Sequence, residues 1–365
     1  MAKLAMWGHC ELKHSNLTVA VLSYKFSLHP RAQRIAKALV QARFRVKAWE
    51  APKVVRRGPR VLRGVLNYVR AIVEVSLLKA DVYWIENVPD VVYLPIAVMK
   101  RRYIYDRRSP WVLHLTVEFP YLAKFSRIIG AIERFMIKNA CMVVLASTPL
   151  SREFDYNAFG KDTIVIPNYP ESAFKCSRDR SLRKELGIPD NVPIFLFLGK
   201  LSLVEGIDLL AKTAIALKGT GAELWIVGDG PARGIAKSLA EKYSHVRWFG
   251  WVNRGEVPQY LGSADYGLVP RRKRPGSVFY THEGVIKIGE YLRCGLPVIA
   301  SGVAPSPFYL RVDEEEFPLI VRKIALGLLD VPKPPLIPSW EEAASPRVVD
   351  VTDRCLSGGL GNARV

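Results

Sequence analysis

Apolar residues follow two different rhythms along this chain, and the two rhythms alternate. Short runs rich in Val, Ile and aromatic residues predict strands, beginning with Leu17–Leu22. Longer segments with apolar residues every three or four positions predict helices, beginning with His29–Gln41. Strands that alternate with helices of about 10–15 residues indicate βαβ units and parallel sheets.

Two such series are visible, separated by the polar, proline-containing segment Pro167–Asp190. The first series has the expected strands Leu17–Leu22, Phe44–Ala48, Val82–Ile85, Tyr103–Tyr105, Val112–Leu115, Cys141–Ala146 and Thr163–Ile166, and a long helix at Tyr121–Asn139. The second has the expected strands Ile194–Leu198, Glu223–Val227, Val246–Phe249, Tyr266–Val269 and Pro297–Ala300. A last helical segment, Ser339–Leu356, should be kinked by Pro346.

The composition fits a globular protein of two domains. The chain has 365 residues, 49% of them hydrophobic, and no run of about 18 apolar residues predicts a transmembrane helix. The five cysteines are odd in number, widely spaced and without a CxxC pair. We therefore expect neither a zinc site nor disulfides and favour a reducing, cytoplasmic location. Glutamine is scarce, which hints at a thermophilic source.

Positive charge is concentrated in the first half of the chain. Residues 1–175 contain 28 Lys and Arg against 13 Asp and Glu, a net charge of +15. Residues 176–365 contain 25 against 21, which adds +4 and gives the +19 of the whole chain. We expect an anionic partner for the first half, such as a membrane surface or a phosphorylated lipid. Nucleic acid is not expected, because aromatic and basic residues are not interleaved as in a base-stacking surface.

One segment of this half has the pattern of a lipid-binding helix. Tyr121–Asn139 carries an apolar stripe with Lys124, Arg127, Arg134 and Lys138 close beside it. Such a helix either docks on the inner, anionic face of a membrane or packs its apolar side inward and leaves a basic side in water.

Three motifs of the second series lie where a parallel sheet binds its ligands. The GKL motif directly follows a strand, so Lys200 is placed to meet an anionic group at the carboxyl end of the sheet. The sequence VGDGP at 227–231 makes a strand-to-helix turn, which is also common as plain structure. A helix beginning near Gly284 offers backbone N–H groups to phosphate, and Glu290 within it can accept two ribose hydroxyls. Lys287 and Glu290 alternatively form an ordinary surface ion pair.

The order of the motifs is more informative than any one of them. GKL, EG-x-D, VGDGP, FGWV, SADYGLVP and K-x-x-EY-x-x-CGLPVIAS follow one another between residues 199 and 301. This order resembles the C-terminal domain of the retaining family 4 glycosyltransferases, strongly over 195–301 and more weakly over 17–175. The SWEE sequence at 339–342 is similar to the start of the family's final segment.

The resemblance implies a GT-B fold, an α/β architecture with parallel sheets and two facing Rossmann-like domains. An acceptor-binding domain over 1–172 would be joined by the C-terminal segment 341–365, which crosses back to it, and a nucleotide-sugar-binding domain would span 173–340. The implied activity is that of a hexosyltransferase. It would move a sugar from a UDP- or GDP-sugar to an acceptor, lipid-linked in one version, with retention of configuration and with neither metal nor cofactor.

The resemblance also assigns roles to residues of the second domain. Glu290 would hold the ribose, Lys200 would neutralise the diphosphate, and the backbone N–H groups of Val285 and Ile286 would bind it. Lys200 and Glu290 are thus the catalytic candidates. The donor-binding set further includes Trp251, Val252, Arg271, His282, Glu283, Gly284 and Lys287.

Several positions depart from the family pattern. Glu205 stands where a second Lys is common, and the basic run Arg271–Arg274 either compensates for it or is a solvated loop. His282 occupies the family's first acidic position with Glu283 one residue away, so which of the two meets the donor sugar stays open, and Glu283 is a secondary catalytic candidate. In the first domain Arg108 takes a His position. The acid or base candidates there are Asp106, His114 and Glu118.

Two other functions remain open at this point. A sugar-nucleotide epimerase on the same architecture would also bind a nucleotide-sugar, but should bring more His and carboxylate groups to the site. A non-catalytic scaffold that kept the fold is favoured somewhat by Glu205 and by the missing first-domain His.

Overall fold

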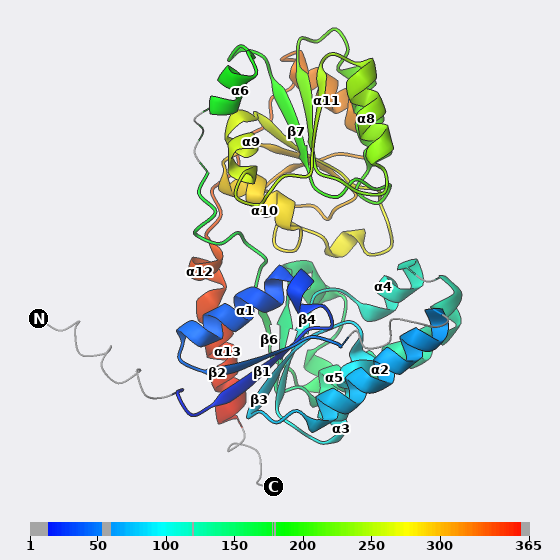
Figure 1. Cartoon of the computed structure of the whole chain (residues 1–365), viewed down its shortest axis with the longest axis vertical. Helices are drawn as coiled ribbons and strands as arrows, with labels where there is room; N and C mark the ends of the chain where they lie inside the picture. Colours follow the sequence, from blue (N-terminus) through cyan, green and yellow to red (C-terminus); the bar gives the residue numbers. More distant parts are fainter. Residues whose placement is uncertain (1–13, 53–59, 119, 177, 179, 359–365) are drawn as a thin grey trace, which may run out of the picture. The chain divides into compact units, whose positions relative to one another are not determined.

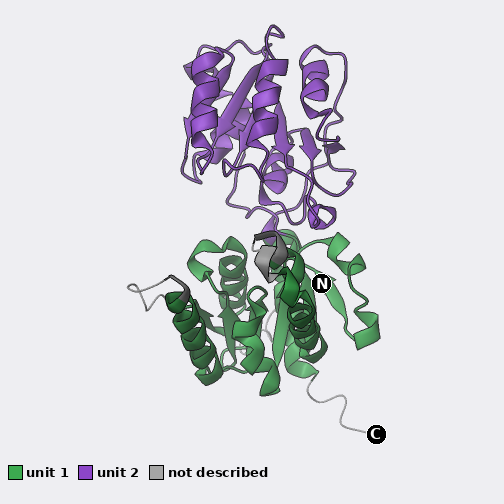
Figure 2. Ribbon diagram, turned by 90° about the vertical axis from the view of Figure 1, so that its right-hand side faces the viewer, with its two compact units in different colours: residues 1–167, 341–365 green, residues 168–340 purple. Residues whose placement is uncertain are grey.

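The computed structural model describes residues 14–52, 60–118, 120–176, 178 and 180–358. The chain forms two compact units, each with its own sheet (Figure 2). Unit 1 comprises residues 1–167 and 341–365, and unit 2 comprises residues 168–340. The boundary therefore falls at 167/168, where the sequence suggested 172/173.

Unit 1 is built on a six-stranded parallel sheet with the strand order β2-β1-β3-β4-β5-β6. Its strands are β1 (Thr18–Leu22), β2 (Arg45–Trp49), β3 (Val82–Glu86), β4 (Tyr103–Arg107), β5 (Met142–Leu145) and β6 (Thr163–Val165). Every residue of β3, β4 and β5 is buried. This burial explains why β5 and the first residues of β3 and β4 are apolar without alternation, because a parallel strand covered on both faces has no polar side.

Helices cover both faces of this sheet (Figure 1). They are α1 (Pro30–Gln41), α2 (Arg60–Leu77), α3 (Asp90–Val98), α4 (Trp111–Glu118), α5 (Ser126–Asn139) and α13 (Ser345–Ser357). The connecting segments contain four short 3-10 helices, η1 (Phe26–Leu28), η2 (Pro120–Phe125), η3 (Thr148–Arg152) and η4 (Asn157–Phe159). Helices α1 and α13 pack together over one face, and α2, α3 and α5 form a row over the other.

The C-terminal segment returns to unit 1, as the GT-B pattern implied. It consists of α12 (Trp340–Ala343) and α13, which packs on α1 and on strands β3 to β5. The kink expected at Pro346 is a full break between two helices. Pro346 lies in the first turn of α13, where its missing N–H would have had no partner in the helix.

Unit 2 has a second six-stranded parallel sheet, ordered β12-β11-β10-β7-β8-β9. Its strands are β7 (Ile194–Leu198), β8 (Glu223–Val227), β9 (Val246–Gly250), β10 (Tyr266–Pro270), β11 (Val298–Ser301) and β12 (Leu310–Arg311). One face of this sheet is covered by three helices, α7 (Ile207–Ala216), α8 (Arg233–Lys242) and α11 (Phe317–Ala325) (Figure 1). The other face is covered by α6 (Ser181–Glu185), α9 (Val257–Ser263) and α10 (Ile286–Arg293). The 3-10 turn η5 (Ser277–Phe279) lies in a loop.

A buried apolar core lies between the sheet of unit 2 and α7, α8 and α11. Phe195 and Phe197 of β7, Leu210 of α7 and Phe317 of α11 are at most 1% exposed within it. Side chains of alternate β7 residues point to the same face, so this strand supplies aromatic rings to one helical layer.

Two expected elements of unit 1 are wrong. The run Val112–Leu115 is part of helix α4, not a strand. A four-residue apolar run cannot distinguish a buried strand from a buried helical turn by its periodicity, and here Pro110 precedes a helix start. The single helix expected at Tyr121–Asn139 is divided into the 3-10 turn η2 and helix α5.

The expectation that the cysteines are unpaired is also wrong. Cys141 is bonded to Cys355 and Cys176 to Cys294, with Cα–Cα distances of 5.3 Å in both pairs. The partners are 214 and 118 residues apart in sequence, so only the tertiary fold brings them together. The argument for a reducing compartment loses its basis, because disulfides persist in oxidising compartments or inside hyperthermophiles. The fifth cysteine, Cys10, lies outside the described residues.

Within the described part of the chain, no helix combines the length and the apolar character needed to cross a bilayer.

Candidate functional site

The candidate site of unit 2 lies at the carboxyl ends of β7 and β10. Strand order runs outward from β7 through β8 and β9 and, on the other side, outward from β10 through β11 and β12. Ligands of open α/β sheets bind outside the carboxyl ends at the point where the order reverses. Lys200 follows β7 after Gly199, and Arg271 follows β10 directly.

A cluster of three charged side chains occupies this position. Lys287 of α10 donates a hydrogen bond from Nζ to Oε2 of Glu205 over 2.7 Å. Nη2 of Arg271 lies 3.4 Å from Oε1 of the same carboxylate. The three side chains are between 12% and 18% exposed. Two positive charges and one negative charge leave the cluster with a net positive charge beside the strand ends.

Burial and pairing act in opposite directions on these groups. Burial lowers the pKa of Lys287, and the adjacent Glu205 carboxylate opposes this effect. Burial raises the pKa of Glu205, but Lys287 and Arg271 outweigh it, so this pKa is lowered and the carboxylate is ionised at neutral pH. Glu205, which departs from the family pattern, therefore holds Lys287 in a buried ion pair. The sequence pattern did not suggest this pairing.

Glu290 also forms an ion pair, with Arg254. Its Oε1 lies 2.9 Å from Nη1 of Arg254, and its side chain is only 6% exposed whereas Arg254 is 53% exposed. The Arg254 guanidinium lies over the ring of Phe174, 5.6 Å from its centre. A ribose hydroxyl that reached Glu290 would meet a carboxylate already oriented by this arginine. The sequence motifs gave no role to Arg254.

The first turn of α10 supplies fewer free amides than expected. The amides of Gly284 and Val285 donate to the carbonyl of Thr281 over 3.1 and 2.9 Å. The Val285 amide, expected to bind a diphosphate, thus already has an acceptor. Ile286 and Lys287 follow in the first helical turn, where backbone N–H groups have no acceptor inside the helix.

Glycines allow the loops around the cluster to approach one another. A Cβ at Gly199 would lie 2.9 Å from Nζ of Lys287, and one at Gly228 would lie 1.9 Å from the carbonyl oxygen of Gly199. Gly206 has a φ of +80°, and a Cβ there would lie 1.4 Å from the carbonyl oxygen of Pro270. The GKL, VGDGP and EG motifs therefore have a structural role in addition to any contact with a ligand.

A cavity of about 320 Å³ opens beside these loops. Its lining combines the loops after β7, β8 and β9, with Leu198, Gly199, Lys200, Val227, Gly228, Asp229, Trp251, Val252 and Val257. Lys200 is exposed, and Trp251 is 69% exposed. The structure thus brings together Lys200, Trp251 and Val252, three residues of the predicted donor-binding set.

His282 and Glu283 differ in their surroundings. His282 is buried, its ring stacks on Phe308 at a centre-to-centre distance of 4.1 Å, and Ser306 Oγ lies 3.3 Å from its Nδ1. Burial lowers its pKa, opposed by the nearby Glu283. Glu283 is half-buried, and its carbonyl accepts a hydrogen bond from the Asn168 amide over 2.6 Å.

The basic run after β10 is divided between two roles. Arg271 belongs to the charge cluster, and its guanidinium lies over the Tyr280 ring. Arg272 pairs instead with Asp208 and with Glu314, the latter over 2.7 Å. Only the first residue of the run therefore takes part in the cluster. Among the described residues, no group of three or more His, Cys, Asp or Glu has the arrangement of a metal site.

The segment that carries the charge cluster matches a known protein family. Residues 192–323, which include β7, the charge cluster and α10, match the family model described as "Glycosyl transferases group 1". This part of the chain is therefore similar to the group 1 glycosyltransferases.

The chain is also similar to curated proteins that carry glycosyltransferase names. It is 25% identical over 210 residues to a Bacillus subtilis protein assigned as a glycosyltransferase of teichuronic acid biosynthesis, covering 55% of this chain and 50% of that one. It is 24% identical over 198 residues to an uncharacterized glycosyltransferase of Methanocaldococcus jannaschii, covering 49% and 46%. The chain thus spans about half the length of the curated relatives it matches.

Solved structures show that the chain has the GT-B fold. Sucrose-phosphate synthase of Thermosynechococcus elongatus superposes with a TM-score of 0.65 at 17% identity, covering 94% of this chain and 98% of that one. An Anabaena protein solved with UDP and glucose gives 0.59 at 13% identity, covering 94% and 100%. A glycosyltransferase involved in lipopolysaccharide biosynthesis gives 0.59 at 15% identity, covering 95% and 100%.

In unit 1, Asp106 is not available as an acid or base. It is fully buried at the end of β4, where Arg31 donates two hydrogen bonds of 2.7 Å to its carboxylate. An ion pair enclosed in this way is structural. The side chains of His114 and Glu118 lie outside those that the structure describes. Arg108, which replaces the family His, lies 3.2 Å from Glu86 through its Nε.

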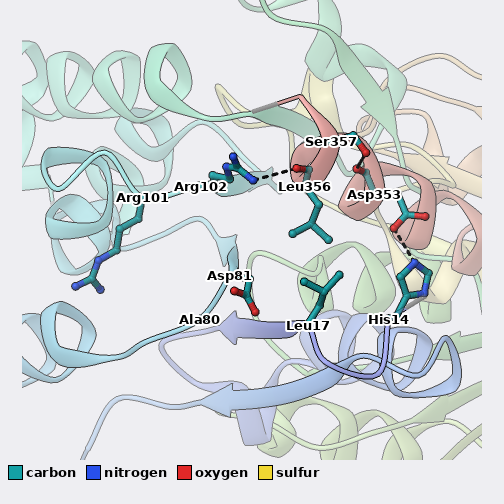
Figure 3. A pocket seen from close by; sticks show the side chains of 9 residues that line it. All are labelled: His14, Leu17, Ala80, Asp81, Arg101, Arg102, Asp353, Leu356 and Ser357. Carbon is teal, nitrogen blue, oxygen red and sulfur yellow. Dashed lines mark hydrogen bonds and ion pairs between the residues drawn. The ribbon is translucent and has the colours of Figure 1, made fainter. Parts of the chain in front are cut away.

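Unit 1 has a cavity of about 580 Å³, which lies at the amino end of its sheet. Figure 3 shows its lining: His14, Leu17, Ala80, Asp81, Arg101, Arg102, Asp353, Leu356 and Ser357. His14 Nε2 is 2.9 Å from Asp353, and Arg102 donates to the Leu356 carbonyl over 3.0 Å (Figure 3). These polar groups hold α13 to the sheet and to its loops.

Proposed function

We propose that this chain transfers a hexose from a nucleoside diphosphate sugar to an acceptor, with retention of anomeric configuration and without a metal ion. The observation that carries the proposal is the charge cluster at the β7/β10 reversal, built from Glu205, Arg271 and Lys287. It has a net positive charge, it lies where an α/β sheet binds ligands, and it lies within residues 192–323, which match the group 1 glycosyltransferases.

The chemistry of sugar transfer requires positive charge at this place. The donor's bond to its diphosphate weakens before the acceptor bond is complete, so negative charge accumulates on the leaving group. Fixed cations and helix N–H groups stabilise that charge and lower the barrier. Lys200, Lys287 and the Ile286 amide are the groups that would meet the diphosphate, and Glu290 would bind the ribose. The Anabaena neighbour, solved with UDP and glucose, supports a uridine donor as the first to test.

We also propose that unit 1 attaches peripherally to an anionic membrane on its cytoplasmic side, through α2 and not through the expected helix at 121–139. The outer side of α2 carries apolar side chains that are between 44% and 73% exposed, namely Leu62, Val65, Leu66, Val69, Val73 and Leu77. Their spacing of three or four places them on one face. Ala71 and Val75, on the opposite face, are buried.

The basic half of the sequence fits this surface. Unit 1 carries most of the chain's excess positive charge, and exposed Arg127, Arg134 and Lys138 lie on α5, in the row of helices to which α2 belongs. A helix with an apolar stripe and a cationic neighbourhood binds anionic interfaces. A lipid-linked acceptor would then be presented at the surface where the enzyme is held.

Vesicle flotation tests the membrane proposal. The full chain should float with phosphatidylglycerol-containing vesicles at low salt, and the double variant Val69→Glu/Val73→Glu should stay in the soluble fraction. Ile215→Glu, which changes an equally exposed apolar residue of α7 in unit 2, is the matched control and should float normally. Equal flotation of all three proteins, or none for the wild type, would contradict the proposal.

Product analysis tests the transferase activity. The purified chain is incubated with a panel of UDP-, GDP- and ADP-sugars and candidate lipid or sugar acceptors. We expect free nucleoside diphosphate together with a glycosylated acceptor whose anomeric configuration matches that of the donor. An isomerised donor without released nucleotide would identify an epimerase. Donor binding without any turnover, across the panel, would identify a scaffold.

A further inference from the structure

The sheet of unit 1 also reverses its strand order, and a polar cluster lies at that point. The order β2-β1-β3-β4-β5-β6 places the reversal between β1 and β3. Ser23 follows β1 directly, Glu86 is the last residue of β3, and His29 immediately precedes α1. All three thus lie at the carboxyl end of the sheet, where open α/β sheets bind ligands.

Glu86 is the centre of this cluster. Its side chain is 1% exposed, and it accepts a hydrogen bond from the Ser23 hydroxyl. His29 Nδ1 lies 2.8 Å from Oε2, and Arg108 Nε lies 3.2 Å from Oε1. Burial raises the pKa of Glu86, but Arg108, His29 and Ser23 outweigh it, so the pKa is lowered and the group is a carboxylate.

This arrangement fixes the tautomer of His29. A carboxylate only accepts hydrogen bonds, so Nδ1 of the neutral ring carries the hydrogen that points to Glu86. Nε2 then has a free lone pair and accepts a hydrogen bond. The ring is 25% exposed, and among the described residues none pairs with Nε2. The side chain does not cap α1, so the helix start does not account for its orientation.

We infer that His29 Nε2 binds a hydroxyl group of the acceptor substrate, and that Glu86 is the positioning residue that holds the imidazole for this contact. The ligand class is a sugar or another polyhydroxy alcohol, because hydroxyl groups are the donors that a glycosyl acceptor presents to an imidazole lone pair. This inference rests on the proposed transferase activity, and it gives unit 1 a binding residue that the sequence motifs did not indicate.

Imidazole ¹⁵N spectroscopy tests the contact without requiring turnover. The full chain is labelled with ¹⁵N-histidine, and its signals are assigned with His29→Gln and His14→Gln. His14 is the matched control, because it also faces a carboxylate, Asp353, but both its nitrogens are engaged, Nδ1 with the Ala42 carbonyl over 3.0 Å. Methyl glycosides of glucose, galactose, mannose and N-acetylglucosamine serve as the probes.

We expect His29 to show a protonated Nδ1 and an unprotonated Nε2, and the Nε2 signal to shift with at least one glycoside while His14 does not. Glu86→Gln should retain a folded spectrum, lose the fixed tautomer and weaken glycoside binding by about tenfold. No response of His29 to any probe, or an unchanged acceptor KM in His29→Gln, overturns the inference.

The two proposals fail separately. A glycoside response at His29 in a chain that transfers no sugar would overturn the transferase activity and support a sugar site in unit 1. Transfer that proceeds with an unchanged acceptor KM in His29→Gln would support the activity and overturn the role of His29. Donor affinity, measured by thermal shift with UDP, should be the same in His29→Gln and in the wild type.

Discussion

The two units solve the same geometric problem with different residues. Each has a six-stranded parallel sheet whose strand order reverses once, and each places charged side chains at the carboxyl ends flanking that reversal. In unit 2 the cluster of Glu205, Arg271 and Lys287 has a net positive charge. In unit 1 the buried carboxylate of Glu86 holds a partly exposed His29. The first suits a diphosphate and the second a hydroxyl, so the fold sets where ligands bind and the side chains set which ligand it is.

The largest effect on stability should come from removing the disulfides. One disulfide lies in each unit. Cys141–Cys355 ties α13 to the start of β5, and Cys176–Cys294 ties the entry of unit 2 to the end of α10. Removing either should cost about 2–5 kcal/mol of unfolding free energy, because both close long loops. Calorimetry of Cys355→Ser and Cys294→Ser measures the two separately. A native thiol count of five without reductant would contradict both bonds.

A comparably large change in stability should follow from pH, and it should be confined to unit 1. Burial and the charge of Glu133 raise the pKa of Asp90 to about 7. Between its unfolded pKa and about 7, the folded chain binds a proton that the unfolded chain has released. The stability of unit 1 should therefore fall as pH rises through this window, by up to about 4 kcal/mol, and stay level above it.

Asp90→Asn should flatten that dependence, because the amide keeps a hydrogen-bonding partner for Tyr105 without a charge. Urea unfolding of wild type and variant between about pH 5 and 8 gives the difference. Parallel curves for the two proteins would show that Asp90 is ionised throughout. Unit 2 provides the internal reference, since its unfolding should not respond to the substitution.

Lys287→Ala should weaken donor binding by about 10- to 100-fold, the range expected for a lost charged hydrogen bond. Acceptor KM should not change, because the residue lies only in the unit 2 cluster. Lys237→Ala is the control, since this lysine forms an exposed ion pair with Glu241 on α8. Equal donor affinity in the two variants would remove Lys287 from the site.

Glu205→Gln should change donor affinity least, and it should strengthen donor binding instead of weakening it. Removing the negative charge frees Lys287 and Arg271 to meet the diphosphate, so donor affinity should rise by roughly threefold to tenfold. The isosteric amide keeps the packing. Isothermal titration with UDP at low and physiological salt measures the change. Weaker binding would mean that Glu205 itself orients the lysine for the ligand.

The sequence pattern is sufficient for most of the fold and for part of the site. Buried parallel strands such as Leu17–Leu22 are continuous apolar runs, and periodic spacing marks the helices. The run at Val112–Leu115 predicts the wrong element because it is too short to show a period, and β12 gives no signal because it has only two residues. Lys200 and Glu290 can be located because family motifs surround them.

The remaining features depend on contacts between distant parts of the chain. Glu205 and Lys287 are 82 residues apart, and His29 and Glu86 are 57 apart. Both pairs meet only because strands adjacent in space are not adjacent in sequence. The same holds for the two disulfides. Arg254, in the loop before α9, gives no sequence signal that it reaches Glu290.

The most direct test of the central claim is the affinity of the full chain for nucleotide donors, measured by calorimetric titration with UDP, GDP, ADP and their glucose esters. We predict that the wild type binds at least one of these nucleotides and that Glu290→Ala binds it at least about tenfold more weakly. Equal affinity of the two proteins, or no binding of any nucleotide by the wild type, would contradict the assignment of the donor site to the β7/β10 reversal of unit 2.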